Sequence, residues 1–315
     1  MKLVTFSTPE FPKPHLGLVQ NDEVFDVDLA ARALQLTVSD SMLALIEQYE
    51  QGQKTLQELL AKANNRPFSQ VKTFTDVGAA HRLQEVKVYA PIPQPRKNVM
   101  CMALNYAEHA KETADIRERA TTAPPTIPIL FTKATTTING PYDPFVIDPT
   151  VSNEIDWEVE LGVIIGKGGR HISEADALSH IFGYTVINDI TARDLQTRHK
   201  QFFLGKSLDG SCPIGPYIVT ADEIADPQKL ALRLRVNGET KQDSNTSEMV
   251  FSIPTIIATL SAVLTLEPGD IIATGTPSGV GFSRNPPEFL KPNDIVECEV
   301  EGVGILRTPI RSVHK

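Results

Sequence analysis

The segment from Glu154 to Asp189 constrains the fold and chemistry of this chain more than any other. It begins with Glu-Ile-Asp-Trp-Glu-Val-Glu-Leu at residues 154–161, where acidic and apolar residues alternate strictly. This period of two predicts a half-buried strand with Glu158 and Glu160 on one face and apolar side chains on the other. A second apolar run ends at Asp189. Three carboxylates near strand ends could hold a hard divalent cation, although alternation alone is more typical of a strand that simply faces water.

The overall composition is ordinary for a soluble globular protein and narrows the class of partner. The 315 residues suffice for one large domain and a small one, with 41% hydrophobic and 22% charged residues. Few aromatic residues and 23 prolines favour strands and turns over a helical bundle. The net charge of −9 argues against nucleic acid or an acidic membrane as partner. A small anionic substrate is compatible with it, because a local cluster of cations can dominate a pocket.

Cysteine spacing and the apolar segments predict a cytoplasmic location. The three cysteines lie far apart without a C-x-x-C pair, so neither a disulfide framework nor a thiolate zinc site is expected. The apolar run within residues 1–9 is too short for a signal peptide. The longest uncharged stretch, residues 249–266, contains Pro254 and predicts a buried helix rather than a membrane span.

The pattern divides the chain into two parts. Residues 1–85 predict a small N-terminal accessory domain, in which short strands around an Asn-Asp turn precede two helical patterns. Three alternating prolines between residues 91 and 95 indicate an extended connection. The larger part, residues 86–315, contains many short strands and turns and few helices. We therefore expect an α+β chain that is rich in β-strand.

Two polar residues after the strand at 99–102 suggest acid–base chemistry. If the following segment is helical, His109 and Glu112 lie three residues apart on one face and can hydrogen-bond. A carboxylate fixes the tautomer of an imidazole and stabilises its protonated form, as a general base requires. Taken alone, an ordinary surface pair is the more frequent meaning of this spacing. The polar and then proline-rich residues 113–128 predict a long loop of the kind that covers active sites.

Further polar residues follow Asp189. Arg193 and Gln196 lie three apart on a predicted helix, where they could bind a substrate carboxylate or remain ordinary surface residues. The Gly-Lys-Ser at residues 205–207 is not a phosphate-binding loop, because Lys200 occupies the position of its first glycine. Lys206 instead suits an electrostatic role beside an anion. No G-x-G-x-x-G supports a dinucleotide cofactor, and the glycine-rich residues 274–281 allow close backbone approach to a ligand.

Five motifs now stand in a specific order along the chain. They are Leu-Asn-Tyr-x-x-His-x-x-Glu at 104–112, Glu-Val-Glu at 158–160, Asp-x-x-x-Arg-Asp-x-Gln at 189–196, Gly-Lys-Ser at 205–207 and Thr-Gly-Thr-Pro-Ser-Gly at 274–279. This set resembles the fumarylacetoacetate hydrolase family over roughly residues 86–311, and in particular its acylpyruvase and 2-hydroxyhepta-2,4-diene-1,7-dioate isomerase-like members. The sequence departs from the family at Met102-Ala103, where a glycine is common.

The resemblance implies a fold, a cofactor and a set of roles. The fold would be a β-rich roll of mixed sheets, usually in a homodimer, with one Mg²⁺ or Mn²⁺ per subunit. The implied metal ligands are Glu158, Glu160 and Asp189. The implied catalytic residues are His109, Glu112 and Lys206, and the implied substrate-binding residues are Tyr106, Arg193, Gln196, Gly275 and Thr276.

These residues are compatible with several reactions on a small anionic 2-oxo acid. From the sequence we favour hydrolysis of a carbon–carbon bond in an acylpyruvate or fumarylpyruvate. His109 and Glu112 would activate water in this reaction. The electrons would then flow into an enolate stabilised by the metal and Lys206. The alternative is a decarboxylase or isomerase of 2-oxo or 2-hydroxydienoate diacids, as in aromatic catabolism. A metal-binding scaffold without turnover is the third alternative.

Overall fold

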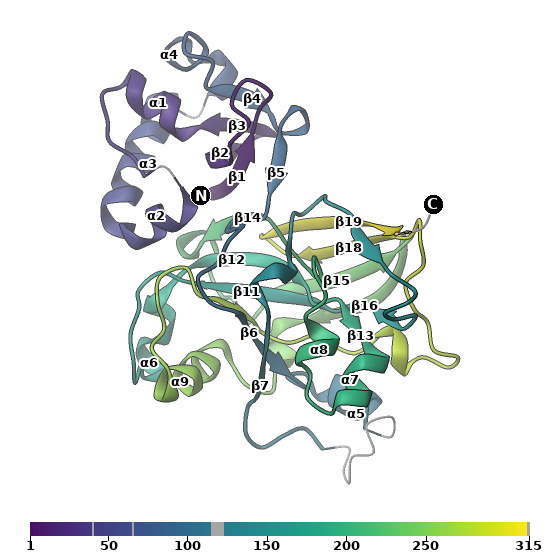
Figure 1. The fold of residues 1–315 in the computed structure, drawn as a ribbon. Coiled ribbons are helices and arrows are strands. Elements are labelled where there is room, and N and C mark those ends of the chain that lie inside the picture. Colours follow the sequence, from purple (N-terminus) through teal and green to yellow (C-terminus); the bar gives the residue numbers. More distant parts are fainter. Residues whose placement is uncertain (40, 65, 115–122, 314–315) are drawn as a thin grey trace.

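A computed structural model describes residues 1–39, 41–64, 66–114 and 123–313 (Figure 1). In this part of the chain the strands form a 12-stranded sheet, a 5-stranded sheet and a 2-stranded pair. Across the large sheet the order is β4 (Ala80–Arg82), β3 (Glu23–Asp26), β2 (His15–Gln20), β1 (Lys2–Ser7), β14 (Cys212–Thr220), β12 (Ile181–Asn188), β11 (Val159–Ile165), β17 (Ile271–Ala273), β6 (Val99–Ala103) and β7 (Ile129–Lys133). In addition, β5 (Lys87–Tyr89) pairs with β1, and β8 (Ile138–Asn139) pairs with β14.

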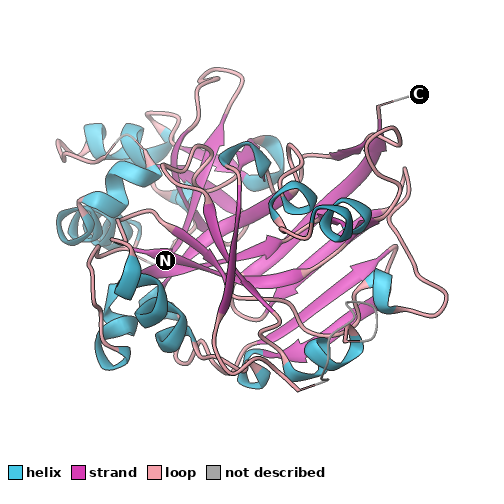
Figure 2. Cartoon of the chain, turned by 60° about the horizontal axis from the view of Figure 1, so that its bottom comes forward, coloured by secondary structure: helices cyan, strands magenta, loops and turns pink. Residues whose placement is uncertain are grey.

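The remaining strands and the helices surround this sheet, and Figure 2 shows helices mainly at the periphery. The 5-stranded sheet has the order β16 (Glu239–Asn245), β15 (Ala231–Val236), β18 (Ile295–Val300), β19 (Gly304–Ser312) and β9 (Phe145–Ile147). The short pair consists of β10 (Ile155–Asp156) and β13 (Thr191–Ala192). The α-helices are α1 (Val27–Ala33), α2 (Met42–Glu47), α3 (Tyr49–Ala63), α4 (Lys72–Thr75), α5 (Ala107–Glu112), α6 (Glu174–Ala177), α7 (Arg193–His199), α8 (Phe203–Lys206) and α9 (Ile253–Val263). The expected β-rich α+β fold is confirmed.

The N-terminal strands are continuous with the large sheet. Leu3 of β1 lies opposite Ile218 of β14, so β1 to β4 extend the sheet at one edge. Helices α1 to α4 cover these strands at the upper left of Figure 1. Buried side chains from both parts, such as Leu16 and Phe182, belong to one hydrophobic cluster. The domain boundary at residue 85 stays a prediction, because the shared sheet crosses it.

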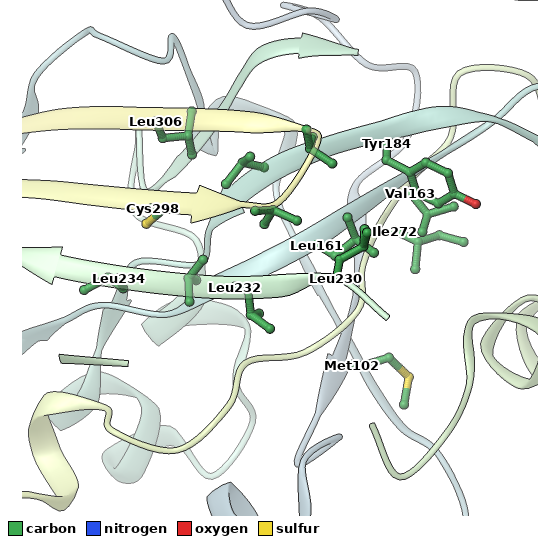
Figure 3. Close-up of a cluster of buried hydrophobic side chains, with 14 of the residues drawn as sticks. Met102, Leu161, Val163, Tyr184, Leu230, Leu232, Leu234, Ile272, Cys298 and Leu306 are labelled. Carbon is green, nitrogen blue, oxygen red and sulfur yellow. The ribbon is translucent and has the colours of Figure 1, made fainter. Parts of the chain in front are cut away.

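The main hydrophobic core lies between the two large sheets. Figure 3 shows Leu232, Leu234 and Leu306 of the 5-stranded sheet facing Leu161 and Val163 of β11. Aliphatic side chains alternate along β15, with the intervening arginines partly exposed, which is the pattern of a sheet with one solvated face. An Asn-Gly turn at residues 237–238 joins β15 to β16. None of the helices in the described ranges is long and apolar enough to cross a membrane, and the uncharged stretch forms α9.

The acidic segment is not one continuous strand, in contrast to the prediction. Its ladder is interrupted at Trp157 and Glu158, between β10 and β11. Side chains replace the strand partners there, because Glu158 N donates to Asn188 Oδ1 (3.1 Å) and the amide of Trp157 donates to Asp156 Oδ1 (2.8 Å). The strand is also fully buried rather than half-buried as predicted, because β11 runs between β12 and β17 and all of its residues are buried.

The register of β11 against β12 brings two acidic positions together. Val159 lies opposite Asn188, and Glu160 lies opposite Ile187. Asp189 directly follows β12, and its amide donates to the Glu158 carbonyl oxygen over 2.9 Å. The backbone pairing alone therefore places Asp189 beside Glu158, although 31 positions separate them in the sequence.

Three short helices carry the remaining polar residues of the site. Figure 1 shows α5, α7 and α8 grouped at the lower right of the molecule. Gly205 permits the close approach of α8 to α7, since a Cβ atom at this position would lie 2.6 Å from the backbone nitrogen of Gln196. The segment that carries His109 and Glu112 is helical and forms α5, which meets the condition for their pairing. The predicted covering loop at 113–128 falls largely on residues 115–122, which lie outside the described ranges.

Candidate active site

Three buried carboxylates form the centre of the site. Glu158, Glu160 and Asp189 each offer an oxygen atom, and these atoms lie within 4.8 Å of one another. Glu160 comes from β11, whereas the other two follow the ends of β10 and β12. All three side chains are buried. The structure thus brings together the three residues proposed from sequence as metal ligands.

Two oxygen atoms of this cluster lack a hydrogen-bond donor within the described part of the chain. One is Glu160 Oε1, whose sister atom Oε2 accepts from Gly275 N over 2.7 Å. The other is Asp189 Oδ1, which has an ion-pair partner but no hydrogen bond. Buried oxygens are nearly always satisfied, so Glu160 Oε1 indicates a missing partner, whereas Lys133 already compensates the charge at Asp189 Oδ1. Closely spaced carboxylate oxygens are the ligands that Mg²⁺ and Mn²⁺ prefer, and the residues fit such an ion.

Three buried cations face the acidic cluster. Lys206 Nζ donates to Glu158 Oε2 and to Asp189 Oδ2, both over 2.7 Å. Arg193 Nη2 donates to Glu158 Oε1 over 2.7 Å, and Lys133 Nζ lies 2.8 Å from Asp189 Oδ1. Buried charges persist in this way only when they are paired.

The electrostatics of the cluster single out Glu160. Burial, together with the charges of Asp189 and Glu158, raises the pKa of the Glu160 carboxyl well above its usual value. Burial opposes ionisation of Glu158 too, but the charges of Lys206 and Arg193 outweigh it and lower the Glu158 pKa. Glu160 therefore gains more than Glu158 from a further cation in the cluster.

The glycine-rich loop binds the carboxylates of the site through its backbone. Three of its amides donate to acidic side chains: Gly275 to Glu160 (2.7 Å), Gly279 to Glu112 (2.9 Å) and Gly281 to Asp156 (2.6 Å). Gly279 has φ +102°, and a Cβ atom there would lie 2.2 Å from the Lys241 carbonyl oxygen, so a side chain is excluded. Close backbone approach was expected from the sequence. In the structure these three amides bind carboxylates of the protein itself.

The predicted His–Glu pair is present on α5. His109 Nδ1 lies 2.8 Å from Glu112 Oε1, and the imidazole is buried. Glu112 is fixed in turn by the amide of Gly279 and by Ser283 Oγ, which donates to Glu112 Oε2 over 3.0 Å. Nδ1 is thereby engaged with a carboxylate, which leaves Nε2 as the ring nitrogen for proton transfer.

One small cavity joins these groups. Its free space is about 10 Å³, about the room that one water molecule needs, and it is lined by both polar and apolar side chains. The lining residues are Met102, Ala103, Leu104, His109, Phe131, Glu158, Gln196, Phe202, Lys206 and Thr276. A proton-transfer group, a cation and an acidic residue of the cluster thus meet at one small cavity.

Three of the five residues expected to bind substrate are engaged mainly with the protein, and a fourth, Tyr106, does not line the cavity. Arg193 is held by Asp156 (Nε to Oδ2, 2.8 Å) and Glu158, and Gly275 by Glu160. Thr276 lines the cavity, but its hydroxyl donates to the Val159 carbonyl oxygen over 2.9 Å. The Tyr106 hydroxyl is buried without a hydrogen bond to any described residue and lies outside the cavity lining.

Gln196 is the fifth, and its amide faces the cavity with a free donor. Arg193 Nη1 donates to Gln196 Oε1 over 3.2 Å, which fixes the orientation of the amide. Gln196 Nε2 is then buried without a hydrogen-bond partner in the described part of the chain. This group can donate to a carboxylate or keto oxygen of a ligand.

Sequence reasoning missed three residues that the site uses. Lys133 ends β7 and also donates to the Ile190 carbonyl oxygen (3.1 Å) and Ser211 Oγ (3.2 Å). Asp156 accepts from Arg193 and from the amide of Gly281, and Ser283 supports Glu112. A lysine that closes an apolar strand was the only available signal for Lys133. Asp156 lay in the acidic alternation but appeared there to be solvated.

Comparison with known proteins identifies the family. The family described as Fumarylacetoacetate (FAA) hydrolase C-terminal matches residues 98–311. The chain belongs to this family. Among its relatives, oxaloacetate tautomerase YisK of Bacillus subtilis is 43% identical over 312 residues, which cover 97% of this chain and 99% of that protein.

Solved structures of the fumarylacetoacetate hydrolase family match the chain over nearly its whole length. The fumarylacetoacetate hydrolase of Exiguobacterium antarcticum has a TM-score of 0.78 and 37% identity, covering 99% of both chains. The maleylpyruvate hydrolase of Sphingobium sp. SYK-6, solved in complex with manganese (II) ion and pyruvate, has a TM-score of 0.75 and 31% identity, again covering 99% of both chains. The chain is therefore a metal-dependent enzyme of this family, with a buried acidic cluster suited to the ion.

Proposed function

We propose that the chain interconverts the enol and keto forms of a small 2-oxo diacid of the oxaloacetate type, with Mg²⁺ or Mn²⁺ bound to the acidic cluster. The similarity to YisK, a relative named as an oxaloacetate tautomerase, carries the choice of reaction. It favours the isomerase alternative over the carbon–carbon hydrolase preferred from sequence. The small size of the cavity lined by His109, Gln196 and Lys206 supports a short substrate.

Tautomerisation moves a proton between carbon 3 and the oxygen on carbon 2, and no carbon–carbon bond breaks. A bound Mg²⁺ or Mn²⁺ would act as a Lewis acid on the carboxylate and keto oxygens of the substrate. His109 would exchange the proton at carbon 3, because Glu112 holds its other ring nitrogen. In enol-to-keto conversion the imidazolium would give a proton to carbon 3 while the enol oxygen releases its own proton to water, and the reverse reaction would run through the same transfers in the opposite direction. Gln196 Nε2 would hold a substrate oxygen and so fix the orientation of carbon 3 toward the imidazole.

Lys206 supplies positive charge where the substrate develops negative charge. Its ammonium lies in the cavity wall and is anchored by Glu158 and Asp189. Those partners raise the Lys206 pKa despite the opposing effect of burial, so the side chain stays charged. A fixed cation in a buried site stabilises a developing oxyanion without reorganisation.

Hydrolysis of an acylpyruvate is the second candidate. The His109–Glu112 pair could equally activate water, and the structural relative from Sphingobium is named as a maleylpyruvate hydrolase. The two reactions share the site and differ in whether water attacks the distal carbonyl.

We also propose a homodimer in the cytoplasm that acts on a free small molecule rather than on nucleic acid or membranes.

Proton NMR with Mn²⁺ kept substoichiometric separates these reactions. The protein is mixed with enol oxaloacetate or with acetylpyruvate, alongside a control with metal and no protein. The proposal predicts faster enol-to-keto conversion of oxaloacetate and no cleavage of acetylpyruvate. Release of pyruvate and acetate would establish the hydrolase instead. Pyruvate formed from oxaloacetate faster than in the control would establish a decarboxylase.

A further inference from the structure

Two phenylalanines form an aromatic wall on one side of the cavity. Phe131 comes from β7, and Phe202 directly precedes α8. Their rings meet edge to face, with centroids 5.5 Å apart and an interplanar angle of 74°. Both residues line the cavity together with His109 and Lys206. The wall is therefore part of the surface that a substrate must contact.

Helix α8 ties the aromatic wall to the charged part of the site. Lys206 N donates to the Phe202 carbonyl oxygen over 2.9 Å, so the two residues lie one helical turn apart and on the same face. The Lys206 ammonium lies 5.1 Å from the centre of the Phe131 ring and 2.7 Å from Glu158 and Asp189. The phenyl rings therefore lie close to the acidic cluster. Little space separates the rings from the carboxylates.

The two phenylalanines of the wall also contact neighbouring apolar residues. Phe131 and Phe202 pack against a cluster of buried residues formed by Ala103, Leu104 and Ala110. The free space in the cavity is about 10 Å³, which is about the room that one water molecule needs, so the walls of the cavity lie close together. Contacts with these apolar neighbours hold the two rings beside the cavity.

We propose that Phe202, supported by Phe131, determines the length of 2-oxo acid that the site accepts. A four-carbon diacid can keep both carboxylates on polar groups such as Lys206, Gln196 Nε2 and the bound metal ion. Each further methylene moves the far carboxylate toward the phenyl rings, where it loses water and gains no hydrogen bond. This inference rests on the proposed function for its four-carbon substrate. The limit itself follows from the position of the wall.

The test compares Phe202→Ala with Phe203→Ala as matched control. Phe203 is the next residue along the chain, 44% exposed, and does not line the cavity. Binding of 2-oxo diacids with four, five and six carbons to the Mn²⁺-loaded proteins is measured by calorimetry. We expect wild type and Phe203→Ala to bind the four-carbon acid best. In Phe202→Ala the six-carbon acid should gain about tenfold or more relative to the four-carbon acid, because removal of the ring opens space for the extra chain.

Two results would overturn the proposal. One is an unchanged ratio of six-carbon to four-carbon affinity in Phe202→Ala, and the other is the same change in Phe203→Ala. Phe202→Leu, which shortens the side chain while keeping apolar packing, provides an intermediate shift if the alanine variant folds poorly. Because binding is read without turnover, a wild type that prefers short acids but leaves enol oxaloacetate unchanged would refute only the proposed reaction. A wild type that tautomerises oxaloacetate but binds all lengths equally would refute only the length limit.

Discussion

Lys133 Nζ lies 2.8 Å from Asp189 Oδ1, and both side chains are fully buried. Asp189 is thus held between two ammonium groups, because Lys206 binds its other oxygen. Together, Glu158, Glu160, Asp189 and Asp156 face Lys206, Lys133 and Arg193. One negative charge is in excess, so that a dication would leave the cluster positive and suited to a dianionic substrate.

Lys133→Met should lower the stability of the metal-free protein. The variant leaves a buried carboxylate without one of its charge partners, a change that typically lowers the free energy of unfolding by about 3 to 5 kcal/mol. Mn²⁺ should restore more stability in this variant than in wild type, since the ion replaces the lost charge. Urea unfolding with Mn²⁺ or with EDTA measures both effects. Lys72→Met is the control, because Lys72 pairs with Asp76 over the same 2.8 Å on the surface, where loss of an ion pair changes little. Equal stability of Lys133→Met and Lys72→Met would contradict this role.

Glu160→Gln should abolish tight metal binding while the fold is retained. The amide oxygen can still accept from Gly275 N, but the charge that binds the ion is gone. Loss of a residue that only orients a metal ligand typically lowers metal affinity about 10- to 100-fold. We expect Mn²⁺ affinity to fall by more than this in Glu160→Gln, because the variant removes a ligand. Titration followed by electron paramagnetic resonance measures it directly. Glu154→Gln, a partly exposed acid outside the cluster, should bind Mn²⁺ like wild type. Undiminished affinity in Glu160→Gln would remove this residue from the ligand set.

Glu112→Gln should slow turnover without changing metal affinity. Loss of the carboxylate weakens orientation of His109 and stabilisation of its protonated form, and such proton-transfer roles are worth about 10²- to 10⁴-fold in rate. Ser283→Ala should have a smaller effect on kcat, because Gly279 N still donates to Glu112. Steady-state kinetics together with Mn²⁺ titration separates the two properties. A Glu112→Gln enzyme with unaltered kcat would show that the pair has no part in catalysis.

His15 should make the stability of the N-terminal strands depend on pH. Burial opposes its charge, but Asp26, 2.9 Å from His15 Nε2, outweighs burial and raises the His15 pKa. A raised pKa in the folded state stabilises it fully below the unfolded value of about 6.5, and this gain is lost as pH rises through the folded value. The stability difference between wild type and His15→Gln should therefore be larger at acidic than at alkaline pH. A difference independent of pH would show that the ion pair does not contribute.

The sequence predicted much of this site because its ligands lie in local patterns. Each informative pattern spans only a few residues. The patterns are the acidic alternation at Glu158 and Glu160, the helical spacing of His109 and Glu112, and each single family motif. Lys133 escaped notice because its role depends on the ends of β7 and β12 meeting in the tertiary structure. Side-chain hydrogen bonds to the backbone also interrupted the acidic strand, and local alternation cannot reveal such bonds.

The central claim is that metal bound at the acidic cluster drives enol–keto exchange of a 2-oxo diacid. The most direct test follows the ultraviolet absorbance of enol oxaloacetate after mixing with wild-type protein in the presence of Mn²⁺, with EDTA, and with Glu160→Gln in place of wild type. Our account predicts rapid loss of the enol signal only for wild type with Mn²⁺, beyond the rate with free metal. A rate equal to that of free Mn²⁺, or one that is unchanged by EDTA, would contradict it.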